Sequence, residues 1–391
     1  MKRKIKLLAY SNLNFGDDLF VKTICEFFPN QRFELEASEQ YKTVFSAVPN
    51  LQIVSNSCIG NKFNRKVIGF LRRFCPAGAE VATKRQLQKY AAVVYVIGGL
   101  FDEDDLWFSL VEQNGLPKCK QMIWKDSLCD KVPFFLLGCN MTRVNTEKYI
   151  MQMRYLFEDI TDICFRDRYS YNFFSGMRNV RYAPDIVFNY KCRTQKAPNS
   201  NLVLISVWGA LAQCQKLPQW KWAEDKFEPY IEFLADAVSF FLSKEMRVCL
   251  LSLCEDEGDL DACWKLISKG AFSDKVMIRS YHGDIDATVA LFEEAQFVVG
   301  TRFHSVVMAL NTNTPFFPII YESKTEQLLK DLGYKGYFAH IQKPESYQIS
   351  HLMEQYEKKE ILDSTEIKKQ AQEQFSVLKH YLQKSFQKGT E

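Results

Sequence analysis

Short apolar runs alternate with amphipathic stretches along the chain, which is the pattern of strands separated by helices. Between Asp17 and Phe28 the apolar residues recur at helical spacing, so this stretch is predicted to be a helix. The apolar runs of the first half predict strands at Lys4–Tyr10, Arg32–Ala37, Leu51–Ser55, Ala92–Gly98, Val132–Gly138 and Asp162–Phe165.

A polar segment, Lys191–Asn201, carries Pro, Asn and Ser and is typical of a linker. The alternation then restarts. Strands are predicted at Leu202–Trp208, Arg247–Leu253, Val276–Ser280, Phe297–Gly300 and Pro315–Ile320. Helices are predicted between them at Ala223–Ser243, Leu260–Ser268, Asp284–Glu294 and Ser305–Asn311.

Unbroken apolar strands suit parallel sheets that helices cover on both faces. The two runs of alternation therefore predict an α/β protein with two Rossmann-like, doubly wound domains facing a cleft, a GT-B-like architecture. We expect an N-terminal domain at 1–190, a C-terminal domain at 201–345 and a helical tail at 346–391 that packs back across the domains.

Composition narrows the class of protein. A net charge of +3, spread evenly, argues against a nucleic-acid partner. The twelve cysteines include no Cys-x-x-Cys and no zinc-ligand spacing, so we expect reduced, buried thiols and no metal or other cofactor. No apolar run suits a signal peptide or a membrane span, which predicts a cytoplasmic protein.

The first candidate motif follows the first predicted strand and contains Asn14, Gly16 and Asp17. Backbone N–H groups at such a helix start can bind an anion, and Asp17 or Asp18 can cap the helix. A capped strand-to-helix turn without a ligand explains the same residues equally well. No G-x-G-x-x-G fingerprint is present, which disfavours an NAD enzyme.

Two further motifs stand at predicted strand ends in the first half. Gly98 and Gly99 follow one strand, where paired glycines let the backbone approach a ligand closely. Arg166 follows another strand and can bind phosphate or carboxylate, although a surface ion-pair cluster is the alternative. Asp185 follows the last strand of this half, where it orients either a loop or a substrate hydroxyl.

The most informative motif runs from Val299 through Arg302, His304 and Ser305. Arg302 and His304 lie between a strand end and a helix start, beside the positive end of that helix. Lys324 follows the next strand and emerges at the same edge of the sheet. A lone histidine is usually structural, but two cations beside it suit an anion site with proton exchange near neutral pH.

Taken together in chain order, these motifs resemble the polysaccharide pyruvyl transferase family. The resemblance rests on the Asn-x-Gly-Asp turn, the glycine pair, the arginine followed by Ser170, Ala183-Pro184-Asp185, Arg-x-His and Tyr321-x-x-Lys. The chain departs from the family at Leu100, where many relatives have a third glycine, and at the Gly138–Thr142 turn, which lacks a Gly-Pro.

The resemblance implies phosphoenolpyruvate as donor, a surface polysaccharide or its lipid-linked precursor as acceptor, and a pyruvate ketal as product. It implies donor binding in the C-terminal domain and acceptor binding in the N-terminal one. The residues implied are, for catalysis, His304, Arg302 and Asp17; for the donor, Arg302, His304, Lys324, Arg166 and Ser305; and for the acceptor loops, Asn14, Gly16, Asp17, Gly98, Gly99 and Asp185.

Two other functions fit the same architecture. A glycosyltransferase that uses a nucleotide sugar would also present cations to a diphosphate, with Glu322 or Glu326 available for the ribose. A catalytically silent homologue that binds glycan is the second alternative. The basic and apolar stretch Lys62–Phe74 either lies on the inner, anionic face of the membrane, which would suit a lipid-linked acceptor, or is a surface helix with one buried face.

Overall fold

The computed structural model describes residues 4–10, 12–55, 89–96, 98–99, 101–103, 110–113, 116–119, 132–192, 200–216, 218–272 and 274–387. Lys62–Phe74 and most of the predicted linker lie outside these residues. The chain divides into two compact units. Unit 1 comprises Met1–Ser11, Phe20–Ile186 and Gln370–Glu391, and unit 2 comprises Asn12–Leu19 and Val187–Lys369.

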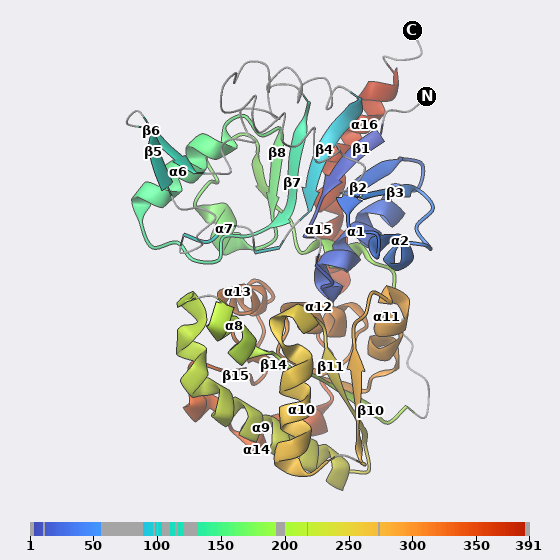
Figure 1. The fold of residues 1–391 in the computed structure, drawn as a ribbon, viewed down its shortest axis with the longest axis vertical. Coiled ribbons are helices and arrows are strands. Elements are labelled where there is room, and N and C mark those ends of the chain that lie inside the picture. The colour runs from blue at the N-terminus through green and yellow to red at the C-terminus, as the bar shows by residue number, and fades with distance from the viewer. Residues whose placement is uncertain are drawn as a thin grey trace. The chain divides into compact units, whose positions relative to one another are not determined.

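Unit 1 contains a seven-stranded sheet in the order β3-β2-β1-β4-β7-β8-β9 (Figure 1). Every neighbouring pair in it is parallel. Its strands are β1 (Lys4–Leu8), β2 (Phe33–Ala37), β3 (Leu51–Ser55), β4 (Tyr90–Val96), β7 (Phe134–Cys139), β8 (Asp162–Phe165) and β9 (Val180–Tyr182). Its helices are α1 (Phe15–Phe27, whose first residues belong to unit 2), α2 (Tyr41–Val44), α6 (Glu147–Phe157), α7 (Arg168–Asn172) and α16 (Ser376–Gln387).

Strand β7 lies inside this sheet, and all of its residues are buried. Phe134 and Leu136 pack in one cluster with residues of α6. Phe135 points to the opposite face, where its ring centroid lies 5.7 Å from that of Tyr381 in α16. Burial on both faces removes the alternation of polar and apolar residues that a half-exposed strand would show.

Unit 2 contains a six-stranded parallel sheet in the order β12-β11-β10-β13-β14-β15 (Figure 1). Its strands are β10 (Leu202–Ser206), β11 (Arg247–Ser252), β12 (Val276–Ser280), β13 (Phe297–Gly300), β14 (Phe316–Ile320) and β15 (Ala339–His340). Its α-helices are α8 (Ala210–Lys216), α9 (Glu224–Ser243), α10 (Asp259–Gly270), α11 (Ile285–Glu294), α12 (Phe303–Asn311), α13 (Ser323–Asp331), α14 (Ile349–Lys358) and α15 (Thr365–Ala371, which ends in unit 1).

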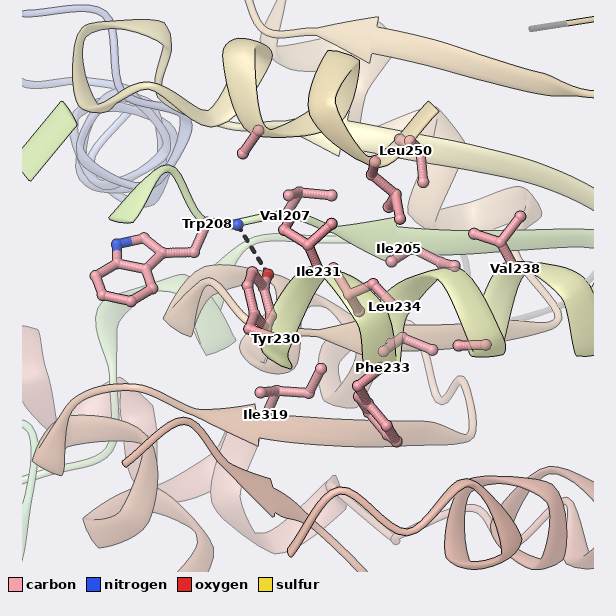
Figure 2. Packing of buried hydrophobic residues seen from close by; sticks show 14 of the residues in the cluster. Ile205, Val207, Trp208, Tyr230, Ile231, Phe233, Leu234, Val238, Leu250 and Ile319 are labelled. Carbon is pink, nitrogen blue, oxygen red and sulfur yellow. Dashed lines mark hydrogen bonds between the residues drawn. The ribbon is translucent and has the colours of Figure 1, made fainter. Parts of the chain in front are cut away.

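The core of unit 2 is built around α9, whose inner side packs on the sheet (Figure 2). Tyr230 is buried in this core, and its hydroxyl accepts a hydrogen bond of 3.0 Å from the backbone N–H of Trp208. The same hydroxyl lies 3.0 Å from Thr301 Oγ1. Since Trp208 follows β10 and Thr301 follows β13, Tyr230 links the ends of two adjacent strands.

The structure confirms the prediction of two doubly wound parallel sheets. The predicted strands are present, with ends that differ by a few residues, while α12 begins at Phe303 rather than at Ser305. The antiparallel hairpin of β5 (Leu110–Gln113) and β6 (Leu116–Cys119) was not predicted. In both sheets the strand order reverses beside the first strand, which marks the edge where ligands bind in open α/β sheets.

The C-terminal segment supplies part of unit 1. The Gln374 side chain accepts a hydrogen bond from Gly138 N and donates one to Ala183 O, at 3.0 and 2.7 Å. Phe375 packs against Phe27, the last residue of α1, and against Phe28, which follows it. Across the described ranges, no helix is both long enough and apolar enough to cross a membrane.

Candidate functional site

The candidate site in unit 2 lies at the carboxyl ends of β10 and β13, where the strand order reverses. Trp208 and Gly209 follow β10, and Arg302 follows β13 as the residue before α12. The backbone N–H of Arg302 donates a 3.2 Å hydrogen bond to Ser206 Oγ, which ties the two strand ends together.

The guanidinium of Arg302 is held by two carboxylates. Its Nε donates to Asp259 at 2.9 and 3.1 Å, and Nη2 donates to the same carboxylate. Its Nη1 pairs with Glu257. The Arg302 side chain is 9% exposed and that of Asp259 is fully buried, so this ion pair lies within the protein rather than on its surface.

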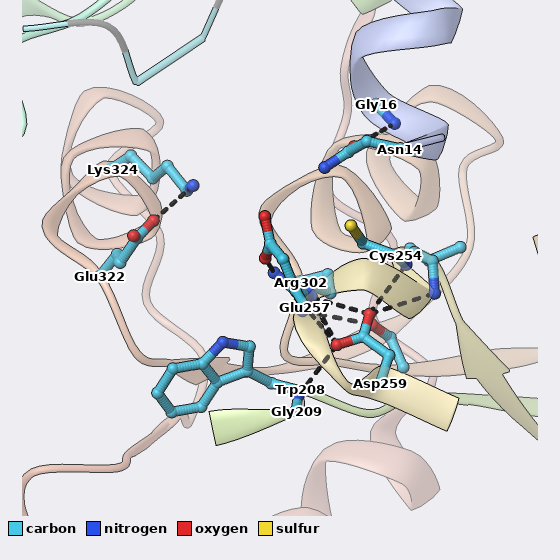
Figure 3. A network of polar contacts seen from close by, with 12 residues as sticks. Asn14, Gly16, Trp208, Gly209, Cys254, Glu257, Asp259, Arg302, Glu322 and Lys324 are labelled. Atoms are coloured by element: carbon cyan, nitrogen blue, oxygen red, sulfur yellow. Dashed lines mark hydrogen bonds and ion pairs between the residues drawn. The ribbon is translucent and has the colours of Figure 1, made fainter. Parts of the chain in front are cut away.

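Asp259 also gathers backbone N–H groups from the neighbouring strand ends (Figure 3). Its carboxylate accepts hydrogen bonds from Gly209 N at 2.9 Å, Cys254 N at 3.0 Å and Leu253 N at 3.2 Å. These groups follow β10 and β11. With Arg302 included, Asp259 connects three adjacent strands of the sheet.

The ionisation of this pair follows from its surroundings. Burial lowers the pKa of Arg302, but Asp259 and Glu257 outweigh this effect and the net pKa is raised well above its usual value. Burial raises the pKa of Asp259, while Arg302 and the N–H of Gly209 act against that rise. The guanidinium therefore stays charged.

A second cation, Lys324, lies in the first turn of α13 and forms an ion pair with Glu322. Lys324 Nζ is 5.4 Å from the centroid of the Tyr321 ring, and Arg302 Cζ is 6.0 Å from the same centroid. Tyr321 is buried, and burial raises its pKa to about 12. The structure thus brings Arg302 and Lys324 to one aromatic ring, whereas the sequence predicted only that they would lie at the same edge of the sheet.

The N-terminal turn joins this site because Asn12–Leu19 belong to unit 2. The N–H of Phe15 donates to Leu253 O at 3.1 Å, next to the backbone groups bound by Asp259. A methyl group built on Gly16 would lie 1.8 Å from His304 Nδ1, so the imidazole packs directly on the glycine backbone. Only glycine leaves room for His304 in this position.

The cap of α1 corrects one prediction. Asn14 Oδ1 accepts the 3.0 Å hydrogen bond from Gly16 N, so Asn14 performs the capping that we expected of Asp17 or Asp18. Both aspartates instead lie in the first turn, where negative charge stabilises the helix. Asp18 is buried and accepts a 2.6 Å hydrogen bond from Tyr281, whereas Asp17 is half-buried.

Ser305 faces inward. Its hydroxyl donates to Arg302 O at 2.5 Å, and its side chain is fully buried. This bond closes the first turn of α12 and holds Arg302 and His304 in a fixed backbone geometry.

Unit 1 has its own buried arginine at the corresponding edge of its sheet. Arg166 follows β8, pairs with Asp185 at 3.0 Å, and donates to Asn140 Oδ1 at 2.7 and 3.1 Å. The guanidinium packs 3.0 Å from the position of a methyl group built on Gly98. A methyl group built on Gly99 would lie 3.3 Å from Thr142 Oγ1.

Sequence reasoning missed three partners of these arginines, namely Asp259 and Glu257 at Arg302 and Asn140 at Arg166. The acidic run Glu255-Asp256-Glu257-Gly258-Asp259 was the available signal. It follows β11, which is separated from β13 only by β10, so these carboxylates emerge at the same edge of the sheet as Arg302. Within the part of the chain that the structure describes, no group of three His, Cys, Asp or Glu residues is placed to hold a metal ion.

Comparison with known proteins identifies relatives in sequence. Residues 14–323 match the family described as polysaccharide pyruvyl transferase. The amylovoran biosynthesis protein AmsJ of Erwinia amylovora is 24% identical over 264 residues, which cover 63% of this chain. The match spans 61% of AmsJ, less than two thirds of that relative.

Solved structures resemble the chain in fold. A UDP-GlcNAc 2-epimerase from Neisseria meningitidis, solved with UDP-GlcNAc, gives a TM-score of 0.56 at 9% identity, covering 98% of this chain and 100% of that one. HepE of Anabaena, solved with UDP and glucose, gives 0.54 at 12% identity over 100% of both chains. At these identities the likeness shows the fold alone, and it confirms the predicted GT-B-like architecture.

Proposed function

This chain belongs to the polysaccharide pyruvyl transferase family, and from that premise we propose that it moves pyruvate from phosphoenolpyruvate onto a saccharide. The product is a pyruvate ketal that bridges two hydroxyls, and inorganic phosphate is released. The acceptor in this proposal is a sugar of a surface polysaccharide or of its lipid-linked precursor. The family relation to a protein of amylovoran biosynthesis supports a role in making such polymers.

The observation that carries the proposal is the position of Arg302, His304 and Lys324. Arg302 precedes α12 and His304 lies in its first turn, after β13 and at the strand-order reversal of unit 2. Lys324 lies against the Tyr321 ring, which Arg302 also approaches. Phosphoenolpyruvate carries a phosphate and a carboxylate, so it needs cations at a ligand-binding edge, together with a group that transfers protons.

The reaction needs two proton transfers that balance. In the first, the methylene carbon of phosphoenolpyruvate gains a proton, and the first sugar hydroxyl loses one as it attacks the central carbon. The second hydroxyl then displaces phosphate from the same carbon and gives its proton to the departing phosphate. We assign the proton transfer at the methylene carbon to His304, since imidazole gains and loses protons near neutral pH.

The other residues divide between binding and positioning. In this proposal Lys324 contacts the donor anion, and Arg302 contributes its positive charge from its fixed place beside Asp259. Gly16 and Ser305 position His304 and Arg302. Asn14 and Asp17 are proposed to serve the acceptor. In unit 1, Gly98, Gly99 and Asp185 are proposed as acceptor-side residues, and Arg166 as a further donor contact.

Thermal shift with phosphoenolpyruvate, UDP and inorganic phosphate tests the proposal, since a ligand that binds only the folded state raises the melting temperature. Lys324→Gln and His304→Gln are the informative variants. Arg302→Ala is not, because it leaves the buried Asp259 carboxylate without its cation and destabilises the fold itself.

We expect phosphoenolpyruvate to stabilise the wild-type protein more than phosphate does, and Lys324→Gln to remove most of that difference. His304→Gln should still bind the donor but release no phosphate when acceptor glycans are added. Stabilisation by UDP with no response to phosphoenolpyruvate would overturn the proposal in favour of a glycosyltransferase. Absence of any response would favour a glycan-binding homologue without activity.

A further inference from the structure

The charges around Tyr321 do not suit an anion as they stand. Arg302 and Lys324 supply two positive charges, while Asp259, Glu257 and Glu322 supply three negative ones. These five side chains therefore sum to one negative charge when all are ionised. Phosphoenolpyruvate would be repelled unless at least one carboxylate leaves its cation.

The carboxylates differ in how firmly they are held. Asp259 is fully buried and accepts three backbone hydrogen bonds besides those from Arg302, so it cannot leave without loss of the strand connections. Glu322 pairs with Lys324 only two residues away, and the two side chains are 13% and 19% exposed. Rotation of one short side chain is enough to separate this pair.

The Glu322 side chain does not cap the helix that follows it. Glu322 occupies the position before the first turn of α13, where a short polar side chain normally caps the helix, yet its side chain makes no capping hydrogen bond. Its carboxylate instead lies on Lys324. A capping serine or aspartate would hold the turn better, so the glutamate is explained by its effect on the lysine.

Trp208 supplies an independent observation. Its side chain is fully buried, and its indole Nε1 has no hydrogen-bond partner among the residues that the structure describes. A buried N–H group of this kind costs free energy unless a partner is provided. The Trp208 ring centroid lies 4.7 Å from that of Tyr321, the ring that Lys324 also approaches. In Figure 3 the indole nitrogen is on the edge turned to the side where Glu322 and Lys324 lie.

We propose that Glu322 is a resident carboxylate that occupies Lys324 until the anionic donor replaces it, and that the indole N–H of Trp208 then donates to an oxygen of the bound donor. Carboxylate replaces carboxylate, so the exchange keeps Lys324 paired while one negative charge of the protein leaves the surroundings of Tyr321. Departure of Glu322 brings the remaining four side chains to neutrality. The indole N–H of Trp208, which has no partner among the described residues, adds a hydrogen-bond donor.

This inference rests on the proposed function, since it concerns how the same site admits phosphoenolpyruvate. It makes Glu322 an internal competitor with the donor. Removing the charge of a competitor strengthens binding, whereas damage to a structural residue weakens it. The direction of the effect therefore distinguishes competition from a structural role.

Isothermal titration with phosphoenolpyruvate measures the competition directly. Glu322→Gln keeps the size of the side chain and should tighten the dissociation constant about fivefold, the value of one moderately exposed ion pair. Trp208→Phe keeps the ring packing but loses the N–H, and should weaken binding about tenfold. Glu326→Gln is the matched control, because Glu326 pairs with Lys330 on the same helix and its loss should leave binding unchanged.

A double variant closes the test. If Glu322 acts through Lys324, then Glu322→Gln has no tightening effect in a Lys324→Gln background. Unchanged or weaker binding by Glu322→Gln, with a wild-type protein that binds phosphoenolpyruvate, would overturn this inference and leave the proposed function standing. A wild-type protein that binds UDP but not phosphoenolpyruvate would overturn the proposed function, and this inference with it.

Discussion

The two units each hold a buried arginine at the carboxyl edge of a parallel sheet, but the two arginines are held differently. Arg166 in unit 1 is 2% exposed in its side chain and shares its donors between Asp185 and the neutral Asn140. Arg302 in unit 2 faces two carboxylates, of which Asp259 also binds three backbone N–H groups.

This difference separates folding from binding. Both arginines connect strand ends, so their charges are largely used within the protein. Lys324 differs from both because its partner Glu322 lies only two residues away in the chain. A cation at a ligand-binding edge can therefore bind a ligand more readily when the carboxylate paired with it is easier to displace. By that measure Lys324 is the most available of the three.

The largest effect expected is that of Asp259→Asn. The variant leaves the buried Arg302 with only Glu257 and weakens three backbone contacts, so we expect a loss of about 3–5 kcal/mol in the free energy of unfolding. Hydrogen exchange should show reduced protection in β10 and β11 but not in β7 and β8. Equal loss of protection in both units would contradict the assignment of Asp259 as a connector within unit 2.

Asp185→Asn tests the other arginine and should cost less, about 2–3 kcal/mol, because Asn140 still accepts from Arg166. The loss should appear in β7, β8 and β9 by the same exchange measurement. If Asp185→Asn costs more than Asp259→Asn, the three backbone hydrogen bonds of Asp259 do not have the weight given to them here.

Alkaline titration tests the surroundings of Arg302 through Tyr321, the ring that its guanidinium approaches. Burial raises the pKa of Tyr321 to about 12, above the ordinary value near 10 for an unfolded tyrosine. Its contribution to stability is therefore complete below about pH 10 and is lost as the pH rises toward about 12, by about 2 kcal/mol. Urea unfolding at pH 9 and pH 11 should show a smaller decline for Tyr321→Phe than for the wild type.

The smallest change in stability is expected for Gly16→Ala. The added methyl group must displace His304, at a cost of about 1–2 kcal/mol that better helix propensity partly offsets. Phosphate release should fall far more than the melting temperature does, because the imidazole moves. Gly176→Ala, where the methyl group meets nothing within 4 Å, is the control. Full activity of Gly16→Ala would show that His304 tolerates the displacement.

The sequence predicted the sheets well because central strands such as β7 and β10 are buried on both faces, which leaves unbroken apolar runs. It also predicted that Arg302 and Lys324 would share an edge, since consecutive strands of a doubly wound sheet end on the same side. It did not predict that Asn12–Leu19 would belong to unit 2, because the contact between Phe15 and Leu253 joins residues far apart in the chain.

The roles of the charges could not be predicted either. A charged residue beside a glycine or a helix start looks the same in sequence whether it binds a ligand or another side chain. Asp259 was expected to lie just before a helix, and Trp208 at the end of a strand, but neither position reveals a buried hydrogen-bond partner or the lack of one. Those facts depend on contacts between different strands.

The C-terminal segment affects the order in which the two units can fold while the protein is being synthesised. Every residue of unit 2 leaves the ribosome before Gln370, whereas unit 1 needs Phe375 against α1, Gln374 at Gly138, and Tyr381 beside Phe135. The nascent chain therefore carries an uncovered apolar face of β7 while unit 2 can already fold. A ribosome that stalls near Gln370 would release a chain whose second unit is finished and whose first is a target for chaperones and proteases.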